Sequence, residues 1–359
     1  MKEVRIGLVG AGKIANDLHF PAYVKAKENN DGVVLAAVCD IDIERAKAAA
    51  EKLGVEKYYA SMEEMIADAD IDAVDICTWN KAHVPLCIAA AKAGKHVMCE
   101  KPAAMTVEEM RELKAILEEK KLVYMLAVPG RFKTDAYALK ERIDAGEFGE
   151  IYYAKTAYIR RRGEPTGWFT DREYSGGGPI IDIGVHAIDA AWYLMGEPKP
   201  VRVSAKAFYD KVKTEHVRTR VHAGAPSPNG DVHTTEDSGS GVIYFDNGAQ
   251  LFFEASWTIH LPDFRETVFA GTKSGAFRAN PNVIYSEKDG ALTDEKLEIP
   301  APNFGYDELM HFANCVKENN VNTIYNIDKA MQMQSILNAI YASSELGREV
   351  TIDEEGNIK

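Results

Sequence analysis

A glycine-rich turn near the start of the chain constrains its fold more than any other feature. Residues 4–9 form a short apolar run typical of a buried strand, and Gly10-Ala11-Gly12-Lys13-Ile14-Ala15 follows directly. This spacing matches the turn that joins a strand to a helix in dinucleotide-binding domains. Gly10 permits a tight turn, Gly12 lets the backbone approach a pyrophosphate, and Ala15 allows the helix to pack closely on the strand. The unpaired N–H groups at the start of that helix favour a phosphate, so we expect Gly10, Gly12, Lys13, Ile14 and Ala15 to bind the cofactor.

The following hundred residues alternate between short apolar runs and amphipathic helical stretches. This alternation predicts an α/β domain with a doubly wound parallel sheet, a Rossmann fold, over residues 1–127. The further strands are expected at 33–39, 73–78, 96–99 and 123–127, and helices at 43–53, 83–93 and 107–120.

After Arg131 the pattern changes to one in which alternating strands dominate, and the chain length of 359 residues leaves room for a second core. We expect residues 128–359 to form an α+β domain with an open, largely antiparallel sheet. Its strands are predicted at 150–161, 202–208, 241–245, 249–257 and 266–271, and its helices at 135–145, 179–194, 306–318 and 329–346. Because few helices remain to cover this sheet, we expect its outer face to be covered by another subunit in a homodimer or tetramer.

Charge and composition exclude several classes of partner. The net charge of −13 opposes binding to nucleic acid or to an anionic membrane surface. No apolar run approaches the roughly 20 residues of a membrane-spanning helix, and the N-terminal residues lack the pattern of a secretory signal. The five cysteines are scattered and are interpreted as reduced core thiols, so we expect a cytoplasmic protein.

A polar stretch at 211–237 is predicted to be a long loop between two strands. It contains His216, His222 and His233, but their spacing matches no common metal site, and we expect no bound metal.

Asp40 follows the second predicted strand, where a carboxylate can accept hydrogen bonds from the hydroxyls of the adenosine ribose. It favours NAD over NADP, because a 2′-phosphate would meet its negative charge and no basic partner is evident. An aspartate at a strand end can also stabilise a turn without any ligand.

Five segments together resemble the Gfo/Idh/MocA oxidoreductases, a family that includes glucose-fructose oxidoreductase and inositol dehydrogenase. The resemblance covers essentially the whole chain. It implies a Rossmann domain, a substrate domain with an open sheet used for oligomerisation, NAD or NADP as cofactor, and a sugar or polyol substrate. One departure is Trp79, where family members usually have proline. The segments are Gly10–Ala15, Thr78-Trp79-Asn80-Lys81-Ala82-His83, Glu100-Lys101-Pro102, Arg131-Phe132 and Gly176-Gly177-Gly178-Pro179-Ile180-Ile181-Asp182-Ile183-Gly184-Val185-His186.

The resemblance carries the family's catalytic positions onto Lys101, Asp182 and His186, which are also expected to contact substrate. Lys101 follows a strand at the carboxyl edge of the sheet, where its ammonium can bind the reacting oxygen; otherwise it is an exposed lysine in a turn. Asp182 and His186 are four residues apart on one face of a predicted helix, and a histidine can accept a hydroxyl proton. Alternatively, Asp182 caps the helix and His186 is a core histidine.

Further residues are assigned to the cofactor or the substrate. Asn80 and His83 are expected to hold the ribose or carboxamide of the cofactor, although Asn80 could instead cap the following helix. Trp168 could stack on a sugar ring, and Arg160, Arg161 and Arg162 could donate to hydroxyls or carboxylates, unless this arginine run is a solvated strand end. Of the three arginines, Arg161 and Arg162 are assigned to the substrate. The remaining residues expected at the cofactor are Thr78, Trp79, Glu100, Lys101 and Arg131.

Three functions are compatible with these features. The leading one is a dehydrogenase that oxidises a secondary hydroxyl of a sugar, glycoside or cyclic polyol to a ketone, or catalyses the reverse reaction. A second is a glycosidase-like or epimerising enzyme that retains NAD and uses transient oxidation. A third is a sugar- or NAD-sensing regulator without catalysis, against which the intact Lys101, Asp182 and His186 argue.

Overall fold

The computed structural model describes residues 3–212, 224–279, 282–299 and 304–359. The chain forms two compact units, each built from two segments. The first unit comprises Met1–Phe132 and Asn303–Met331, and the second comprises Lys133–Pro302 and Gln332–Lys359. The expected domain limits, 1–127 and 128–359, stay a prediction. The compact units differ from that division because residues 303–331 pack with the first unit.

The first unit contains a six-stranded parallel sheet in the order β3-β2-β1-β4-β5-β6. Three of its helices, α2, α3 and α5, begin at side-chain caps: Asp42, Ser61 and Thr106 each accept a hydrogen bond from a backbone N–H of the first turn. The strands are β1 (Val4–Val9), β2 (Val33–Cys39), β3 (Lys57–Tyr59), β4 (Ala73–Ile76), β5 (His96–Glu100) and β6 (Tyr124–Ala127). The helices are α1 (Phe20–Asn29), α2 (Ile43–Leu53), α3 (Met62–Asp68), α4 (His83–Lys92), α5 (Val107–Lys120) and α9 (Phe304–Glu318), with short helical turns at η1 (Ala15–His19), η2 (Asn80–Ala82) and η3 (Pro129–Phe132).

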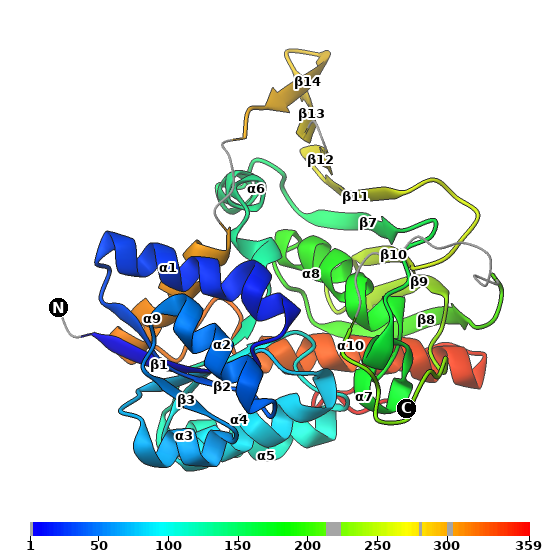
Figure 1. Cartoon of the computed structure of the whole chain (residues 1–359). Coiled ribbons are helices and arrows are strands. Elements are labelled where there is room, and N and C mark those ends of the chain that lie inside the picture. The colour runs from blue at the N-terminus through cyan, green and yellow to red at the C-terminus, as the bar shows by residue number, and fades with distance from the viewer. Residues whose placement is uncertain (1–2, 213–223, 280–281, 300–303) are drawn as a thin grey trace. The chain divides into compact units, whose positions relative to one another are not determined.

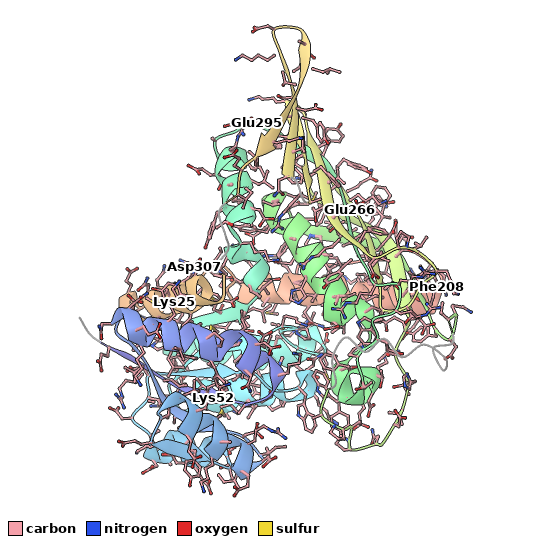
Figure 2. All side chains as sticks on the ribbon, turned by 45° about the horizontal axis from the view of Figure 1, so that its top comes forward. Lys25, Lys52, Phe208, Glu266, Glu295 and Asp307 are labelled. Carbon is pink, nitrogen blue, oxygen red and sulfur yellow. The ribbon has the colours of Figure 1, made fainter. Side chains whose placement is uncertain are left out.

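Helix α9 belongs to this unit although it lies far away in the sequence. It packs against α1, and Figure 2 shows Lys25 of α1 close to Asp307 of α9. The hydroxyl of Tyr306 donates to Asp31 over 2.6 Å. Leu309, Phe312 and Ala313 are buried in the same hydrophobic core as the strands. The amphipathic face of α9 thus completes the core of the first unit.

Arg131 ties the segment after α9 to the sheet. Its side chain is fully buried, stacks on the ring of Tyr325 with 3.7 Å between guanidinium carbon and ring centre, and donates to the carbonyl of Ile324 over 2.9 Å. The N–H of Leu126 in β6 donates to the carbonyl of Tyr325 over 3.0 Å. A buried guanidinium needs such partners to offset its desolvation.

The second unit contains a nine-stranded sheet in the order β14-β13-β12-β11-β7-β10-β9-β8-β15. All neighbouring strands are antiparallel except β7 and β10, which are parallel, so the sheet is mixed but largely antiparallel as expected. The strands are β7 (Ile151–Ile159), β8 (Pro200–Phe208), β9 (Ser238–Phe245), β10 (Gln250–Ser256), β11 (Phe264–Gly271), β12 (Ser274–Arg278), β13 (Asn282–Lys288), β14 (Ala291–Leu297) and β15 (Val350–Thr351).

One face of this sheet is covered by helix α8 (Val185–Leu194), which packs on β7, β10 and β11 (Figure 1). Thr156 of β7 donates to the carbonyl of Ala187 over 3.1 Å, which fixes the helix on the strand. The other helical elements are α6 (Thr134–Asp144), η4 (Gly167–Thr170), α7 (Arg172–Ser175), η5 (Ile180–Gly184) and α10 (Ile327–Leu346), the last of which begins in the segment assigned to the first unit.

Several short or polar elements were not predicted from the sequence. β3 has only three residues, and β14 has the sequence ALTDEKL with no buried position, so neither shows the apolar alternation on which the predictions depend. β14 is held by pairing with β13 and by Glu295, labelled in Figure 2, which accepts from Arg142 of α6 over 2.7 Å. The predicted loop at 211–237 is free of helix and strand where it is described, but His216 and His222 lie outside the described residues.

Replacing Arg131 with Ala should lower the free energy of unfolding by at least about 2 kcal/mol, because it removes a buried ring contact and leaves the carbonyl of Ile324 without this donor. Urea unfolding followed by circular dichroism measures the change. The control is Arg111→Ala on α5, an exposed arginine paired with Glu108 over 3.8 Å, which should cost less than about 0.5 kcal/mol. Equal costs for the two variants would contradict the role given to Arg131.

Candidate active and cofactor-binding sites

The glycine turn has the geometry that a bound pyrophosphate requires. Gly10 has a φ of +96°, and a Cβ atom there would lie 2.6 Å from the carbonyl oxygen of Cys77, so only glycine fits. Around Gly12 the space is open instead: a Cβ atom would meet no atom of the described residues within 4 Å. Ala15 is fully buried and packs in the core. The first glycine is thus required by the fold, and the second leaves space for a phosphate group to approach.

The helix after this turn begins with a π-helical segment, Ala15–His19, before α1 continues. Lys13 and Ile14 are both exposed at its start, and Lys13 forms an ion pair with Asp17. Such π-turns are uncommon and occur mostly at functional sites. The helix start is therefore exposed in this structure, and its contact with the cofactor stays a prediction.

Asp40 is buried at the end of β2, and its carboxylate already has protein partners. Oδ2 accepts from the N–H of Ala11 over 2.9 Å, and Oδ1 accepts from the N–H of Asp42 over 2.9 Å. Arg45 donates to Asp40 over 3.2 Å. The sequence analysis assumed that no basic residue is close to Asp40, and this assumption is wrong. Asp40 therefore orders the glycine turn through the N–H of Ala11, and its contact with the ribose stays a prediction.

His83 is fully buried between two turns at the carboxyl edge of the sheet. Nδ1 lies 2.7 Å from the carbonyl oxygen of Pro102, and Nε2 lies 3.1 Å from that of Thr78. Burial lowers the pKa of His83 and favours the neutral ring, so a single N–H donates and the shorter contact indicates Pro102 as acceptor. In this structure the ring links the two turns, and its predicted contact with the cofactor stays a prediction. Trp79 is half-buried in the first turn and Asn80 is buried in η2.

Lys101 lies directly after β5, at the carboxyl edge where doubly wound sheets bind their ligands. Lys101 is partly exposed, and its backbone N–H donates to Oε2 of the buried Glu100 over 3.1 Å. Glu100 is thus occupied by protein groups, while the side chain of Lys101 extends from a turn that Glu100 and His83 hold. Arg131, also expected at the cofactor, is buried against Tyr325 instead of facing outward.

In the second unit, Asp182 and His186 lie on consecutive helical segments. Asp182 is in the π-turn η5 (Ile180–Gly184) and His186 in the first turn of α8. The predicted helix at 179–194 is present, but its first turn is wider than an α-turn, so the spacing of four does not correspond to one α-helical turn. Asp182 is nearly buried, and His186 is partly exposed.

Two residues that the sequence analysis did not connect with Asp182 lie beside its carboxylate. Nε1 of the buried Trp257 donates to Oδ2 over 3.0 Å, and Arg160 lies 3.9 Å from the same oxygen. Alternation along the predicted strand 150–161 would place Arg160 on the same face as Thr156, which contacts α8, and Arg161 on the opposite face. The observed strand β7 ends at Ile159, just before both arginines.

Glu236 anchors the glycine-rich segment that leads into η5. Its carboxylate accepts from the N–H groups of Gly178 and Ile180 over 3.0 and 3.1 Å and from the hydroxyl of Tyr341 over 2.8 Å. Burial raises the pKa of Glu236, and these donors oppose that effect. At Gly177 a Cβ atom would lie 2.0 Å from the Tyr341 hydroxyl, so this glycine is required for the approach. The start of the segment that carries Asp182 is therefore fixed by a buried carboxylate.

The other expected substrate residues lie nearby in the sequence but differ in exposure. Trp168 is half-buried and stacks on Phe169 with ring centres 4.0 Å apart. Arg161 is exposed, and Arg162 is half-buried and donates to the carbonyl of Arg161 over 2.8 Å. Their contact with substrate stays a prediction.

Models of known protein families match a segment of each unit. A family model described as "Oxidoreductase family, NAD-binding Rossmann fold" matches residues 4–128, and one described as "GFO/IDH/MocA C-terminal domain" matches residues 137–277. The chain belongs to the Gfo/Idh/MocA family of oxidoreductases. The first unit thus contains an NAD-binding Rossmann domain, as the sequence predicts.

Several relatives of this family member are enzymes with named substrates. It is 34% identical over 354 residues to D-glucoside 3-dehydrogenase of Escherichia coli K12, covering 97% of both chains. It is 31% identical over 271 residues to levoglucosan dehydrogenase of Pseudarthrobacter phenanthrenivorans, covering 72% of this chain and 69% of the relative. Among solved structures, an oxidoreductase domain protein from Kribbella flavida matches with a TM-score of 0.85, 23% identity and coverage of 99% of this chain and 100% of that chain, which supports the fold.

Within the part of the chain that the structure describes, no helix combines the length and apolar character needed to cross a membrane.

Replacing Asp40 with Ser should narrow the preference for NAD over NADP by about tenfold or more, because it removes a repulsive carboxylate and leaves Arg45 available to a 2′-phosphate. Calorimetric titration of the wild type and the variant with NAD and with NADP measures the ratio of the two dissociation constants. The control is Asp42→Ser, which also removes a partner of Arg45 at 3.2 Å but leaves Asp40 in place, and its ratio should stay close to that of the wild type. Tighter binding of NADP than of NAD by the wild type would show the assignment of Asp40 to be wrong.

Proposed function

We propose that the protein is an NAD-dependent dehydrogenase that oxidises one secondary hydroxyl of a sugar, glycoside or cyclic polyol to a ketone, or catalyses the reverse reaction. The observation that carries the proposal is the full-length similarity to D-glucoside 3-dehydrogenase, which covers 97% of both chains. The levoglucosan and inositol dehydrogenases among the other relatives support the same class of substrate. We further propose that the enzyme acts in the cytoplasm, where its five buried, unbridged cysteines would stay reduced.

The catalytic roles follow from the chemistry of hydroxyl oxidation. NAD, when bound, supplies the hydride acceptor. A base must take the hydroxyl proton, and a donor must stabilise the developing negative charge on the oxygen. His186 is assigned as the base and the ammonium of Lys101 as the donor. The partial exposure of both residues supports these roles.

Asp182 is assigned to orient the imidazole of His186 and to stabilise its protonated form. Its own position is supported by the bond from Trp257 and by the proximity of Arg160. We assign Trp168, Arg161 and Arg162 to the substrate together with Lys101, Asp182 and His186, and we add Arg160, since it reaches Asp182.

Replacing His186 with Ala should lower turnover by roughly 10²- to 10⁴-fold with little change in NAD affinity, because a positioned general base is lost. Lys101→Ala should be at least as damaging and should also weaken substrate binding. The substrate is first found by screening sugars, glycosides and inositols for NADH formation. Single-turnover hydride transfer in enzyme preloaded with NAD then isolates the chemistry. Wild-type rates in both variants would show that the active site is elsewhere.

The same screen separates the alternatives. Net formation of NADH from added NAD supports the dehydrogenase. Turnover of a glycoside or an epimerisable sugar without net NADH would indicate transient oxidation with retained cofactor. Ligand binding without any turnover would indicate a regulator.

We also propose that the enzyme assembles as a homodimer or tetramer through the face of its second sheet opposite α8. On that face the rings of Tyr153 and Phe252 pack in a tilted arrangement with centres 5.7 Å apart, and the two residues are 37% and 38% exposed. Lys155 and Glu254 pair beside them over 3.7 Å. An exposed aromatic pair rimmed by charges is typical of an interface.

Light scattering at micromolar concentration should therefore give at least twice the chain mass of 39.7 kDa. Phe252→Asp should lower that mass, because it replaces an apolar ring at the proposed interface with a charge that must lose its water on assembly. The control Leu292→Asp changes a residue that is 89% exposed on β14 and should leave the mass unchanged. A monomeric wild type would contradict the proposal.

A further inference from the structure

The buried imidazole of His19 connects the helical segment after the glycine turn to the turn that carries Lys101. His19 is the last residue of the π-turn η1 and is only 4% exposed. Its Nδ1 lies 2.8 Å from Oδ2 of Asp75 in β4, and its Nε2 lies 3.1 Å from Oε1 of Glu100 at the end of β5. The other oxygen of Glu100 accepts the N–H of Lys101 over 3.1 Å. A continuous series of contacts therefore runs from η1 to the backbone of Lys101.

The partners of His19 define its charge. Both ring nitrogens face carboxylate oxygens, which accept but do not donate, so both nitrogens must carry a proton. Burial by itself would lower the pKa of His19, but the adjacent Asp75 raises it well above its usual value. The imidazolium thus bridges two carboxylates, and these charge-assisted bonds are stronger than neutral ones.

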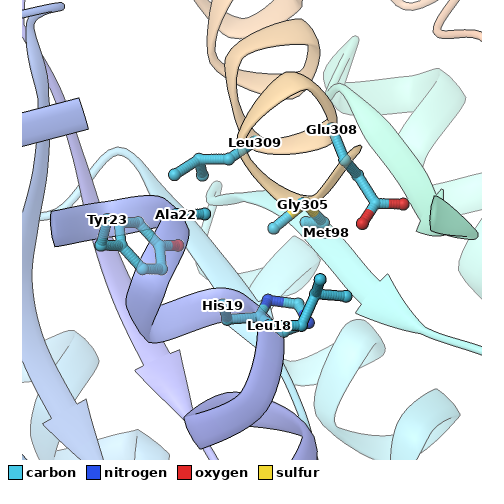
Figure 3. A pocket seen from close by; sticks show the side chains of 8 residues that line it. All are labelled: Leu18, His19, Ala22, Tyr23, Met98, Gly305, Glu308 and Leu309. Carbon is cyan, nitrogen blue, oxygen red and sulfur yellow. The ribbon is translucent and has the colours of Figure 1, made fainter. Parts of the chain in front are cut away.

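Two further titratable groups, Glu308 and Cys77, lie beside this cluster. Glu308 of α9 and His19 both line a small cavity of about 10 Å³, whose lining residues are drawn in Figure 3. Burial raises the pKa of Glu308 well above its usual value, which favours its neutral carboxyl. Cys77 lies close enough to form a possible metal triad with His19 and Asp75, but burial raises its pKa and keeps it a thiol. The geometry is therefore that of a hydrogen-bonded charge network.

We propose that His19 is a positioning residue for Lys101, acting through Glu100. This inference rests on the proposed function, in which the Lys101 ammonium contacts the reacting oxygen. His19 fixes the Glu100 carboxylate, and this carboxylate fixes the first peptide of the turn. His83 fixes the same turn from its other side through the carbonyl of Pro102. Holding the backbone of this turn at both ends fixes the Cα of Lys101 and so limits the positions that its ammonium can adopt toward the substrate.

Tyr23 offers a matched control within the same cluster. Its hydroxyl donates to the same Asp75 oxygen over 2.9 Å, and it is as deeply buried as His19, at 4%. It differs in one respect: no hydrogen bond from Tyr23 to Glu100 is found among the described residues. Tyr23→Phe therefore removes a bond to Asp75 while leaving the series from His19 to Lys101 intact.

The test compares His19→Gln and Tyr23→Phe in single-turnover hydride transfer, with thermal unfolding and NAD affinity measured in parallel. His19→Gln should slow hydride transfer by roughly 10- to 10²-fold, the cost of a misplaced group, with NAD affinity within about twofold of the wild type. Tyr23→Phe should change the rate by less than about twofold, because it removes only a bond to Asp75. In a Lys101→Ala background, His19→Gln should cause no further loss, since the group that it positions is absent.

Equal slowing of hydride transfer by His19→Gln and Tyr23→Phe would overturn the inference. It would also be overturned if His19→Gln slowed the Lys101→Ala variant as much as it slows the wild type, or if the slowing came from weaker NAD binding. If His19→Gln does not fold, Glu100→Gln serves instead, because it keeps the acceptor for the Lys101 N–H and removes the charge bridge. It should show the same selective slowing, and a wild-type rate would overturn the inference. Lys101→Ala alone at the wild-type rate would instead refute the proposed function.

Discussion

The fold of the first unit depends on the close meeting of three strands at Gly10. The N–H of Gly10 donates to the carbonyl of Cys39 over 2.8 Å, and its Cα lies so near the carbonyl of Cys77 that no side chain fits. The next N–H, of Ala11, is taken by Asp40 over 2.9 Å. β1, β2 and β4 thus end at one point, and the turns that follow them are brought to one edge of the sheet. Every residue that we assign to the cofactor from these strands lies at that edge, because parallel strands present all their carboxyl ends together.

The second unit solves a similar problem with a carboxylate instead of a backbone contact. Glycines at 177 and 178 allow the chain to pass close to Tyr341 and Glu236, and Glu236 then accepts the N–H groups that the start of η5 leaves unpaired. A negative group at a helix start also interacts favourably with the helix dipole. The result is a rigid support for Asp182, whose side chain is held in turn by Trp257. Precise placement of reactive groups depends on such supporting contacts.

Buried charge is concentrated behind the proposed catalytic lysine. Asp75, Glu100, Glu308 and His19 are all at most 4% exposed, and such a cluster is costly unless its members are paired or neutral. Here the imidazolium of His19 offsets two carboxylates, and burial raises the pKa of Glu308 and so favours its neutral form. A hydrophobic core of the same size would be a simpler means of stability. The retention of charges at this place is consistent with a requirement for fixed geometry at the carboxyl edge.

The sequence by itself determined the Rossmann fold, the family and the candidate residues, because glycine spacing, apolar periodicity and short motifs are local properties of the chain. It could not assign α9 to the first unit, detect β14, or show that Arg160 lies close to Asp182. It also overlooked Arg45 beside Asp40 and the buried contacts of His19 and Glu236. These features depend on residues that meet only after folding, from 5 positions apart for Arg45 and Asp40 to 275 for Tyr306 and Asp31, and neither periodicity nor motif spacing records such contacts. The tertiary structure alone decided which polar groups were buried together, and burial is what fixes their charge and their partners.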